Sequence, residues 1–297
     1  MLNSQERVKA AISRQPLDRI PRGELVIDDQ LIRRHLNSGS VGFEERAAFI
    51  EELGLDLVTL APAYPGGPEI PGRLEAPLPD LERWVLETPL FTFALLDGAF
   101  GWGTRTQGYT EFLMMLSRSS SRSCRDLIEK VEKLNGALID SLIGRGIDGI
   151  IMADDIAYTR GLMVSPDMLR EHFFPSLARQ LEAAWGRVPV FFHSDGNYTQ
   201  IIPDLIGCGF RGLQCFERQA GMEPRELKKS YPELCLWGTL EVDDLERAGE
   251  PAHLEKLASE ITALSQGQGF ILGTTCGLFP GIDLPGLKAI YRAAGLP

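Results

Sequence analysis

Short apolar runs, many of them rich in β-branched residues, recur along the chain, and an amphipathic segment follows each of them. The runs lack strict alternation of apolar and polar positions, which is typical of strands in a parallel sheet covered on both faces. Eight such runs are found, at residues 20–27, 55–61, 90–98, 147–154, 188–195, 211–217, 234–238 and 269–275. We interpret each run as a buried β-strand.

Helical spacing of apolar residues is found between these runs. Residues 165–186 open with Ser-Pro, which is a helix start signal. The other segments with this spacing are 111–116, 125–144, 197–209, 223–231, 251–269 and 284–295. Eight strand–helix units in a chain of this length predict an α/β fold, a (β/α)8 TIM barrel that forms a single domain over residues 1–297. A doubly wound sheet is the alternative.

Two connections differ from the rest. The Pro- and Gly-rich region 62–89 is too long for a simple connection, so we expect an insertion or a lid near the barrel mouth. The Ser-rich stretch 117–124 is interpreted as an exposed hinge between two helices. No change in composition requires a second domain.

Charge and composition narrow the class of protein. The net charge of −11 over 297 residues argues against a general affinity for nucleic acid or for anionic membranes. The N-terminus lacks the apolar core of a secretory signal, and no apolar run approaches the length of a membrane span. The five cysteines follow no pairing pattern, as expected for reduced thiols. We therefore expect a cytoplasmic protein that acts on a small molecule.

The ends of the predicted strands carry polar side chains, and in a TIM barrel the C-terminal ends of the strands carry the chemistry. Six consecutive runs lead into such residues: Asp97; Asp154 and Asp155; His193 and Asp195; Glu217; Thr239 and Glu241; and Cys276. Packing alone explains such a series poorly. The sequence therefore predicts an active site at this rim.

Three of these residues form a plausible zinc set. His193 and Asp195 are two positions apart, so both point to the same side if the strand continues. Cys276, at the end of the last run, would face them across the mouth. Three protein ligands and one open position are typical of catalytic zinc. Glu217 is interpreted as a fourth ligand or as a partner that orients the histidine.

Simpler interpretations stand beside this one. His193 can be a hydrogen-bonded rim residue, and Cys276 a small buried side chain. Asp154 and Asp155 can cap the following helix. Three other cysteines lie within apolar runs and are interpreted as core residues: Cys208, Cys215 and Cys235. The sequence contains no phosphate-binding glycine loop and no nucleophile elbow.

Several long blocks resemble the uroporphyrinogen decarboxylase superfamily. The first is residues 3–26, "NSQERVKAAISRQPLDRIPRGELV". The later blocks are 106–116, 153–175, 191–242 and 269–295. The resemblance covers nearly the whole chain outside 62–89, and it implies a (β/α)8 barrel.

This superfamily has a decarboxylase branch, which the chain resembles less. Decarboxylases carry an Arg-rich motif near the N-terminus that helps to hold a polycarboxylate substrate, and residues 23–36 lack it. Such a substrate also needs concentrated cationic contacts. The predicted rim is mainly acidic, with Arg160 as an exception.

The other branch comprises cobalamin-dependent methyltransferases, whose zinc motif is His-x-Cys followed far downstream by Cys. His193 and Cys276 match the first and last ligands, and Asp195 replaces the middle cysteine. An aspartate oxygen still binds zinc, but with fewer thiolates the site is less soft. The resemblance thus implies zinc, a corrinoid as methyl carrier, and methyl transfer to a thiol or another small acceptor.

Roles follow from this resemblance for the remaining rim residues. Asp154, Asp155 and Glu217 are expected to be catalytic, by accepting a proton or orienting the reactants. Arg160 is expected to hold an anionic end of the substrate. Further substrate contacts are expected from Asp97, Tyr158 and Glu241. A corrinoid carrier protein is the expected protein partner, and a homodimer is compatible with the sequence. A decarboxylase and a non-catalytic corrinoid- or metal-binding relative remain as alternatives.

Overall fold

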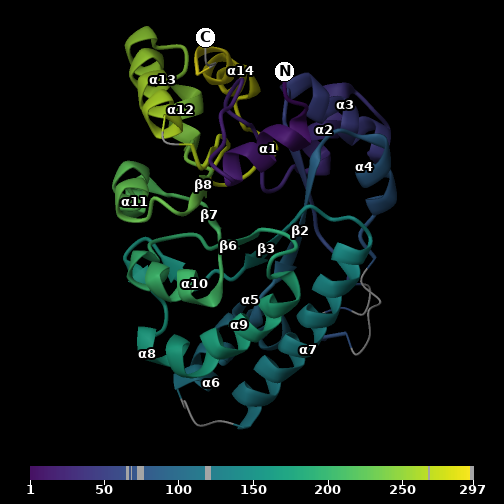
Figure 1. Ribbon diagram of the computed structural model, residues 1–297, viewed down its shortest axis with the longest axis vertical. Coiled ribbons are helices and arrows are strands. Elements are labelled where there is room, and N and C mark those ends of the chain that lie inside the picture. Colours follow the sequence, from purple (N-terminus) through teal and green to yellow (C-terminus); the bar gives the residue numbers. More distant parts are fainter. Residues whose placement is uncertain (65–66, 68, 72–76, 118–121, 267, 295–297) are drawn as a thin grey trace.

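Seven parallel strands form one curled sheet in the computed structural model, which describes residues 1–297 except 65–66, 68, 72–76, 118–121, 267 and 295–297. The strands are β1 (Leu57–Leu60), β2 (Phe91–Asp97), β3 (Gly149–Ala153), β6 (Val190–His193), β7 (Gly212–Gln214), β8 (Cys235–Trp237) and β9 (Phe270–Ile271). They lie side by side in this order (Figure 1). Because the strand order never reverses, the sheet is not doubly wound. Seven of the eight predicted strands are confirmed.

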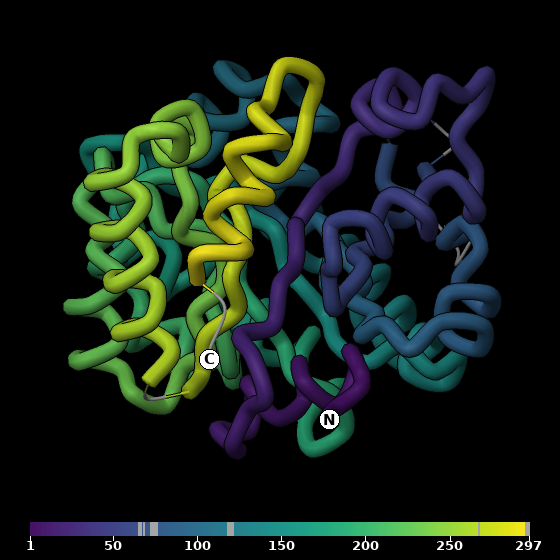
Figure 2. The backbone as a smooth tube through the Cα atoms, turned by 90° about the horizontal axis from the view of Figure 1, so that it is seen from above, coloured from purple at the N-terminus to yellow at the C-terminus, as the bar shows by residue number. Residues whose placement is uncertain are grey.

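The first predicted strand, residues 20–27, is not a regular strand. It lies between β9 and β1, and in Figure 2 the purple N-terminal chain runs beside the yellow C-terminal part. The Gly23 amide donates to Leu272 O at 2.9 Å, and the Asp56 amide donates to Arg22 O at 2.7 Å.

The expectation of eight regular strands is therefore corrected at this segment. Isolated bridges join Arg22 to Leu272 and Ile27 to Leu278. Between the two bridges the N-terminal segment advances by five residues, whereas the segment after β9 advances by six. This mismatch of one residue prevents a continuous ladder.

Helices cover the outer face of the sheet. The helices of four or more residues are α1 (Ser4–Ile12), α2 (Asp29–Leu36), α3 (Phe43–Leu53), α4 (Leu81–Glu87), α5 (Ala99–Gln107), α6 (Tyr109–Ser117), α7 (Arg122–Gly144), α9 (Phe174–Leu181), α10 (Ile202–Cys208), α11 (Pro224–Ser230), α12 (Val242–Glu246), α13 (Pro251–Ser265) and α14 (Leu284–Ala293). Two short strands, β4 (Ala157–Tyr158) and β5 (Gly161–Leu162), form a hairpin after β3. Parts of the predicted insertion 62–89 and hinge 117–124 lie outside the described residues.

The predicted helix 165–186 is interrupted. The short helix α8 (Pro166–Met168) leads into a π-helical turn, Leu169–Phe173, before α9 begins. A continuous α-helix would need a backbone N–H at Pro175, which proline lacks. The wider turn immediately before Pro175 accommodates this missing donor.

Side chains alternate between two cores along the strands. Phe93, Phe191 and Trp237 point to the inside of the curled sheet, and the Phe93 ring centroid lies 5.2 Å from that of Phe191 and 5.4 Å from that of Trp237. Val8 and Ala11 of α1 belong to the same inner core and close its N-terminal end. The interior is thus packed, which leaves the C-terminal rim for a binding site.

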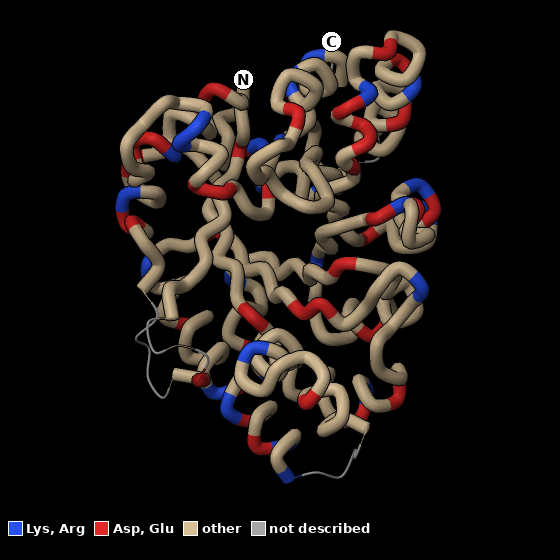
Figure 3. The backbone as a smooth tube through the Cα atoms, turned by 180° about the vertical axis from the view of Figure 1, so that it is seen from behind, with Lys and Arg blue, Asp and Glu red and all other residues tan. Residues whose placement is uncertain are grey.

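Acidic and basic segments are interspersed over the outer helices (Figure 3). None of the helices among the described residues is long and apolar enough to cross a membrane. All five cysteines lie among the described residues as thiols, and four of them are buried.

Candidate metal centre and its surroundings

His193 is the last residue of β6 and is buried at the C-terminal rim. In the register of the sheet it lies opposite Gln214, the last residue of β7. The Nδ1 atom of His193 is hydrogen-bonded to the Gln214 side-chain oxygen Oε1. Because an amide oxygen can only accept, Nδ1 is the donor of this hydrogen bond, so in the neutral ring the lone pair lies on Nε2. That lone pair is the form of histidine that binds a metal ion.

Two carboxylates lie beside this lone pair. The Nε2 atom of His193 is 3.6 Å from Oδ1 of Asp155, which follows β3. The same Oδ1 accepts the backbone amide of Asp195 at 3.1 Å, so the loops after β3 and β6 are tied together. Asp155, His193 and Asp195 each offer a ligand atom, and these atoms lie within 4.8 Å of one another. The predicted pairing of His193 with Asp195 is therefore present in the geometry.

A second group shares Asp195 with the first. Cys215, directly after β7, donates its thiol to Oδ1 of Asp195 at 3.4 Å. Ligand atoms of Asp195, Cys215 and Glu217 also lie within 4.8 Å of one another. Glu217 additionally accepts the Gly196 amide at 2.9 Å, which fixes its carboxylate against the loop of Asp195.

Cys215 was interpreted from the sequence as a core residue, and it is indeed fully buried. Its thiol nevertheless faces the acidic cluster, and burial, followed by the charges of Asp195 and Glu217, raises the pKa of the thiol well above its ordinary value. The signal in the sequence is the Cys-x-Glu spacing immediately after a strand. The apolar residues near Cys215 in "LQCF" favour a position in the core instead.

The loop that carries Asp195 packs tightly on the β4–β5 hairpin. Gly196 has φ +74°, and a Cβ atom there would lie 2.5 Å from the backbone of Tyr158. The Asn197 amide donates to Tyr158 O at 3.0 Å. Only glycine fits this position, so Gly196 sets how the loop that carries Asp195 meets the hairpin.

Asp154 and Asp155 are adjacent but face different ways. Asp154 is buried, and its Oδ1 accepts the Gly101 amide at 2.8 Å, at the N-terminus of α5. Burial raises the pKa of Asp154 to about 8, with Asp97 and Asp155 contributing and the hydrogen bond from Gly101 opposing. Asp154 therefore caps α5, whereas Asp155 faces the metal cluster. The interpretation of these two residues as helix caps therefore holds for Asp154 alone, and the helix that it caps precedes it in the sequence.

Cys276 lies on the same side of the molecule but outside both ligand groups of the described residues. It is exposed, and its thiol donates to Gly277 O at 3.4 Å. Burial of part of the side chain and then the charge of Glu24 raise the pKa of Cys276, with Asp195 as a smaller cause. Its assignment as a metal ligand stays a prediction.

The other predicted rim residues have protein partners. Asp97 is paired with Arg105 of α5, and burial raises its pKa. Glu241 accepts from Arg218 at 3.3 Å and from the Gln219 amide at 3.3 Å, so it holds the turn after Glu217.

The remaining two predicted substrate contacts lie together on the β4–β5 hairpin. Tyr158 is exposed, and the Arg160 guanidinium lies 5.7 Å from the centroid of its ring. Among the described residues, Arg160 is a rim cation with no carboxylate partner.

Glu24 is a buried carboxylate that the sequence reasoning did not identify. It accepts the Thr274 amide at 3.1 Å and the Tyr291 hydroxyl at 2.8 Å, so it joins the first segment to the chain after β9. Burial raises the pKa of Glu24 to about 7. A carboxylate within the apolar run "RGELVI" is the feature of the sequence that could have indicated a buried acid.

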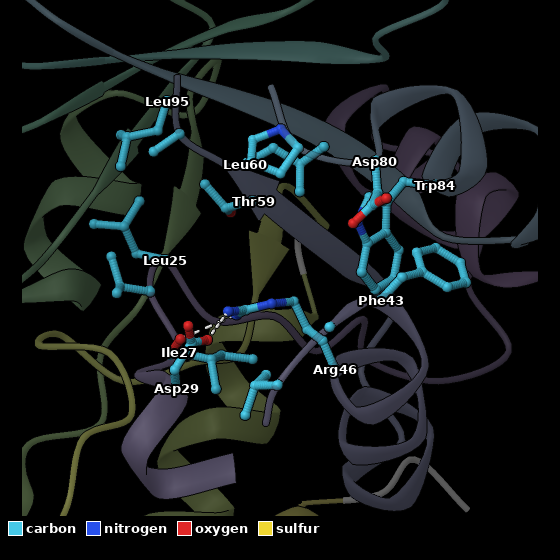
Figure 4. A pocket seen from close by; sticks show the side chains of 15 residues that line it. Leu25, Ile27, Asp29, Phe43, Arg46, Thr59, Leu60, Asp80, Trp84 and Leu95 are labelled. Carbon is cyan, nitrogen blue, oxygen red and sulfur yellow. Dashed lines mark hydrogen bonds and ion pairs between the residues drawn. The ribbon is translucent and has the colours of Figure 1, made fainter. Parts of the chain in front are cut away.

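A pocket of about 350 Å³ opens at another part of the rim, beside β1 and β2 (Figure 4). Phe43 and Trp84 form one wall, and Arg46 reaches in to pair with Asp29. Arg46 also donates to Ile27 O at 3.0 Å. The size and mainly apolar lining suit a small molecule.

Comparison with known proteins assigns the chain to a family. The family model described as Uroporphyrinogen decarboxylase (URO-D) matches residues 102–295. The chain belongs to the URO-D family. Within the family it is similar to the methylcobamide:CoM methyltransferase MtaA of Methanosarcina barkeri, with 27% identity over 157 residues. That match covers 53% of this chain and 44% of the relative, so less than half of the relative's length is spanned.

Solved structures support the fold. A methyltransferase from Methanosarcina mazei superposes with a TM-score of 0.75 at 17% identity, covering 99% of this chain and 98% of that one. A sugar phosphate isomerase/epimerase from Parabacteroides distasonis gives a TM-score of 0.51 at 12% identity, covering 91% and 97%. At these identities the likeness concerns the barrel-like architecture alone.

Proposed function

We propose that this URO-D family protein is a metal-dependent methyltransferase that moves a methyl group between a corrinoid and a small thiol. The observation that carries the proposal is the His193 lone pair, aimed at a rim cluster of carboxylates. The similarity to a methylcobamide:CoM methyltransferase supports the same reaction class.

The donor set fits a zinc ion. Ligand atoms around a tetrahedral zinc ion, with bonds of about 2.0–2.3 Å, stand about 3.3–3.8 Å apart. The distance of 3.6 Å from His193 Nε2 to Asp155 Oδ1 falls in this range. The Asp155 side chain is 60% exposed, so the group is open to solvent on one side. An accessible coordination position is what a catalytic site needs.

The chain's own residues have distinct tasks under this proposal. His193 and Asp195 would hold the ion, and Gln214 fixes the ring orientation of His193. A bound zinc ion would supply acidification of a thiol that enters the open position. Asp155 would offer Oδ1 to the same ion, and its other carboxylate oxygen is suited to accept the proton that the thiol loses. Asp154 would act by fixing the start of α5 rather than by contact with the reactants.

A corrinoid ring is too large for the 350 Å³ pocket and would have to dock on the open mouth. Exposed apolar side chains follow four of the segments that end at this rim: Val26, Tyr158, Val242 and Phe279. These side chains suit a broad ring or a corrinoid carrier protein. Arg160, without a carboxylate partner in the described part of the chain, suits an anionic end of the acceptor.

Methyl transfer from methylcobalamin to a thiol tests this function directly. The reaction forms an S–CH3 bond and breaks the Co–CH3 bond, and the electron pair stays on cobalt, so the corrinoid spectrum changes. We expect zinc-dependent turnover with 2-mercaptoethanesulfonate, and loss of turnover in His193→Ala. A lower KM for this thiol than for uncharged 2-mercaptoethanol, with the difference removed in Arg160→Met, would support the anion contact.

Three outcomes would contradict the proposal. Uroporphyrinogen turnover without added metal would favour a decarboxylase. Corrinoid binding without transfer to any thiol would favour a non-catalytic relative. Turnover that is unchanged in His193→Ala would remove the metal centre from the reaction.

A further inference from the structure

The donor atoms beside Asp195 are of two kinds, and the thiol among them belongs to Cys215. Its Sγ lies 3.4 Å from Asp195 Oδ1, inside the separation of about 3.3–3.8 Å expected for neighbouring ligands of one tetrahedral ion. Glu217 adds a carboxylate to the same group. A thiol and two carboxylates at this spacing offer a divalent cation a set of mixed sulfur and oxygen donors.

The backbone of Cys215 is fixed before any ion binds. Its amide donates to Trp237 O at 3.2 Å, and its carbonyl accepts the Tyr198 hydroxyl at 3.1 Å. The residue has φ +76°, so the chain leaves the extended conformation directly after β7, and the thiol contacts Asp195. The backbone that carries the sulfur is therefore held in place, and the adjustment needed to bind an ion falls to the side chains.

The charges of this group lack a cation. In the described part of the chain, no Lys or Arg forms an ion pair with Asp195 or Glu217. The nearby Arg218 is engaged by Glu241 and Asp244 instead. Two carboxylates beside a buried thiol, without a cationic partner, favour binding of a divalent cation.

Cys276 is placed differently. Its thiol donates to Gly277 O, and it belongs to neither ligand group of the described residues. The sequence at Asp195 also lacks the cysteine of the His-x-Cys motif. A thiol is therefore missing from that motif, and the Cys215 thiol lies one strand further along the sheet.

We propose that Cys215, together with Asp195 and Glu217, supplies the thiolate of this protein's metal centre. The inference rests on the metal ion of the proposed function, but it concerns which thiol binds the ion. Asp195 links this group to His193 and Asp155, so the end of β7 provides the sulfur that the loop after β6 has lost. The metal is thus expected to be one that accepts thiolate, such as zinc or cobalt(II), rather than magnesium.

Titration of the full-length, metal-free protein with Co²⁺ tests the assignment. Thiolate bound to Co²⁺ gives a near-ultraviolet charge-transfer band that carboxylate and imidazole ligands do not give. We expect the band in the wild type and in Cys276→Ser, and its loss in Cys215→Ser with affinity for Co²⁺ reduced at least about tenfold. Cys208→Ser is the control for loss of a buried thiol. Cys208 is the last residue of α10, and its thiol donates to Phe174 O of α9, away from the rim.

A second measurement covers the case in which Cys215→Ser does not fold. X-ray absorption at the zinc edge is therefore measured on zinc-loaded Cys276→Ser, which keeps Cys215. A sulfur ligand at about 2.3 Å from zinc in this variant supports the proposal. A shell of nitrogen and oxygen ligands alone, with a sulfur ligand seen in the wild type, overturns it.

The outcomes also separate this inference from the proposed function. A Co²⁺ complex without a charge-transfer band, in an enzyme that still transfers methyl groups, overturns the thiolate while the function stands. A charge-transfer band lost in Cys276→Ser but kept in Cys215→Ser overturns it as well. A band that depends on Cys215 in a protein without methyl transfer supports the site and contradicts the function.

Discussion

The ring of His193 is held by Gln214, the residue directly opposite it on the neighbouring strand β7. The contact fixes both the orientation and the tautomer of the imidazole, because the amide oxygen accepts the Nδ1 proton. The Nε2 atom is thereby directed at Asp155. Register in the sheet, rather than proximity in sequence, creates this arrangement.

Replacement of Gln214 by leucine should weaken metal binding while the fold is kept. Leucine has a similar shape but cannot accept from Nδ1, and loss of such a partner typically costs about 10–100-fold in metal affinity. Zinc affinity measured by competition with a chelating dye checks this.

Gln180→Leu provides the matched control for Gln214→Leu. Gln180 is also a buried glutamine, but its side-chain oxygen accepts from Asn135, away from the cluster. Its loss should lower stability and leave zinc affinity unchanged. Equal zinc affinity in wild type and Gln214→Leu would show that the contact does not tune the histidine.

Asp154→Asn should change the pH dependence of stability in metal-free protein. The folded-state pKa of Asp154 is raised to about 8 by burial, above its ordinary value of 3.8. The folded state therefore keeps a proton that the unfolded chain releases, so this group's contribution is lost as pH rises between about 4 and 8, by up to about 1.4 kcal/mol per pH unit. Asparagine still accepts from Gly101 but does not titrate.

Urea unfolding from pH 5 to pH 9 measures this difference. The stability of Asp154→Asn relative to wild type should increase with pH, while its zinc content stays normal. Asp155→Asn should instead lower the zinc affinity, because it removes a carboxylate charge beside His193 Nε2. Loss of zinc in Asp154→Asn would place that carboxylate in the metal centre.

Much of the architecture follows from hydrophobic pattern alone. Seven runs became strands within their predicted bounds because each is apolar enough to be buried on both faces. The run 20–27 satisfies the same pattern, but its pairing with β9 slips by one residue, and no local signal encodes the register of a distant partner.

The site is harder to predict from the sequence, because it too depends on contacts between distant segments. His193 and Asp195 stand out because polar residues end an apolar run, whereas Cys215 is itself apolar enough to look like core. Asp154 and Asp155 face different ways because Asp154 is bound by the Gly101 amide of α5, about fifty residues earlier in the chain. Their roles are set by tertiary contacts that spacing cannot express.

Tyr291→Phe should destabilise the protein more at alkaline than at acidic pH. The mutation removes the hydroxyl that donates to buried Glu24 at 2.8 Å but keeps the ring. Burial raises the pKa of Glu24 to about 7, so the lost bond is to a neutral acid at pH 5.5, worth about 1 kcal/mol, and to a carboxylate at pH 8.5, worth about 1.5–3 kcal/mol.

Chemical denaturation at these two pH values measures the cost of Tyr291→Phe. In the double variant Glu24→Gln/Tyr291→Phe, compared with Glu24→Gln alone, the cost of losing the hydroxyl should no longer depend on pH. A cost for Tyr291→Phe that is the same at both pH values in the presence of Glu24 would contradict a titrating carboxylate at this position.

Gly196→Ala should damage the metal loop, and the chain contains a matched control for it. Gly196 and Gly186 have similar positive φ angles, +74° and +69°, so alanine carries a similar backbone cost of about 1–2 kcal/mol at either position. A Cβ atom at Gly196 meets the backbone of Tyr158 at 2.5 Å, whereas one at Gly186 has no atom within 4 Å among the described residues. Backbone cannot move aside as a flexible side chain can, so Gly196→Ala must also shift the loop of Asp195.

We expect Gly186→Ala to lose only the stability set by its φ angle and to keep its zinc affinity. Gly196→Ala should be less stable than Gly186→Ala and bind zinc at least about tenfold more weakly, as a displaced ligand would. Equal zinc affinity in the two variants would mean that the contact with Tyr158 does not position Asp195.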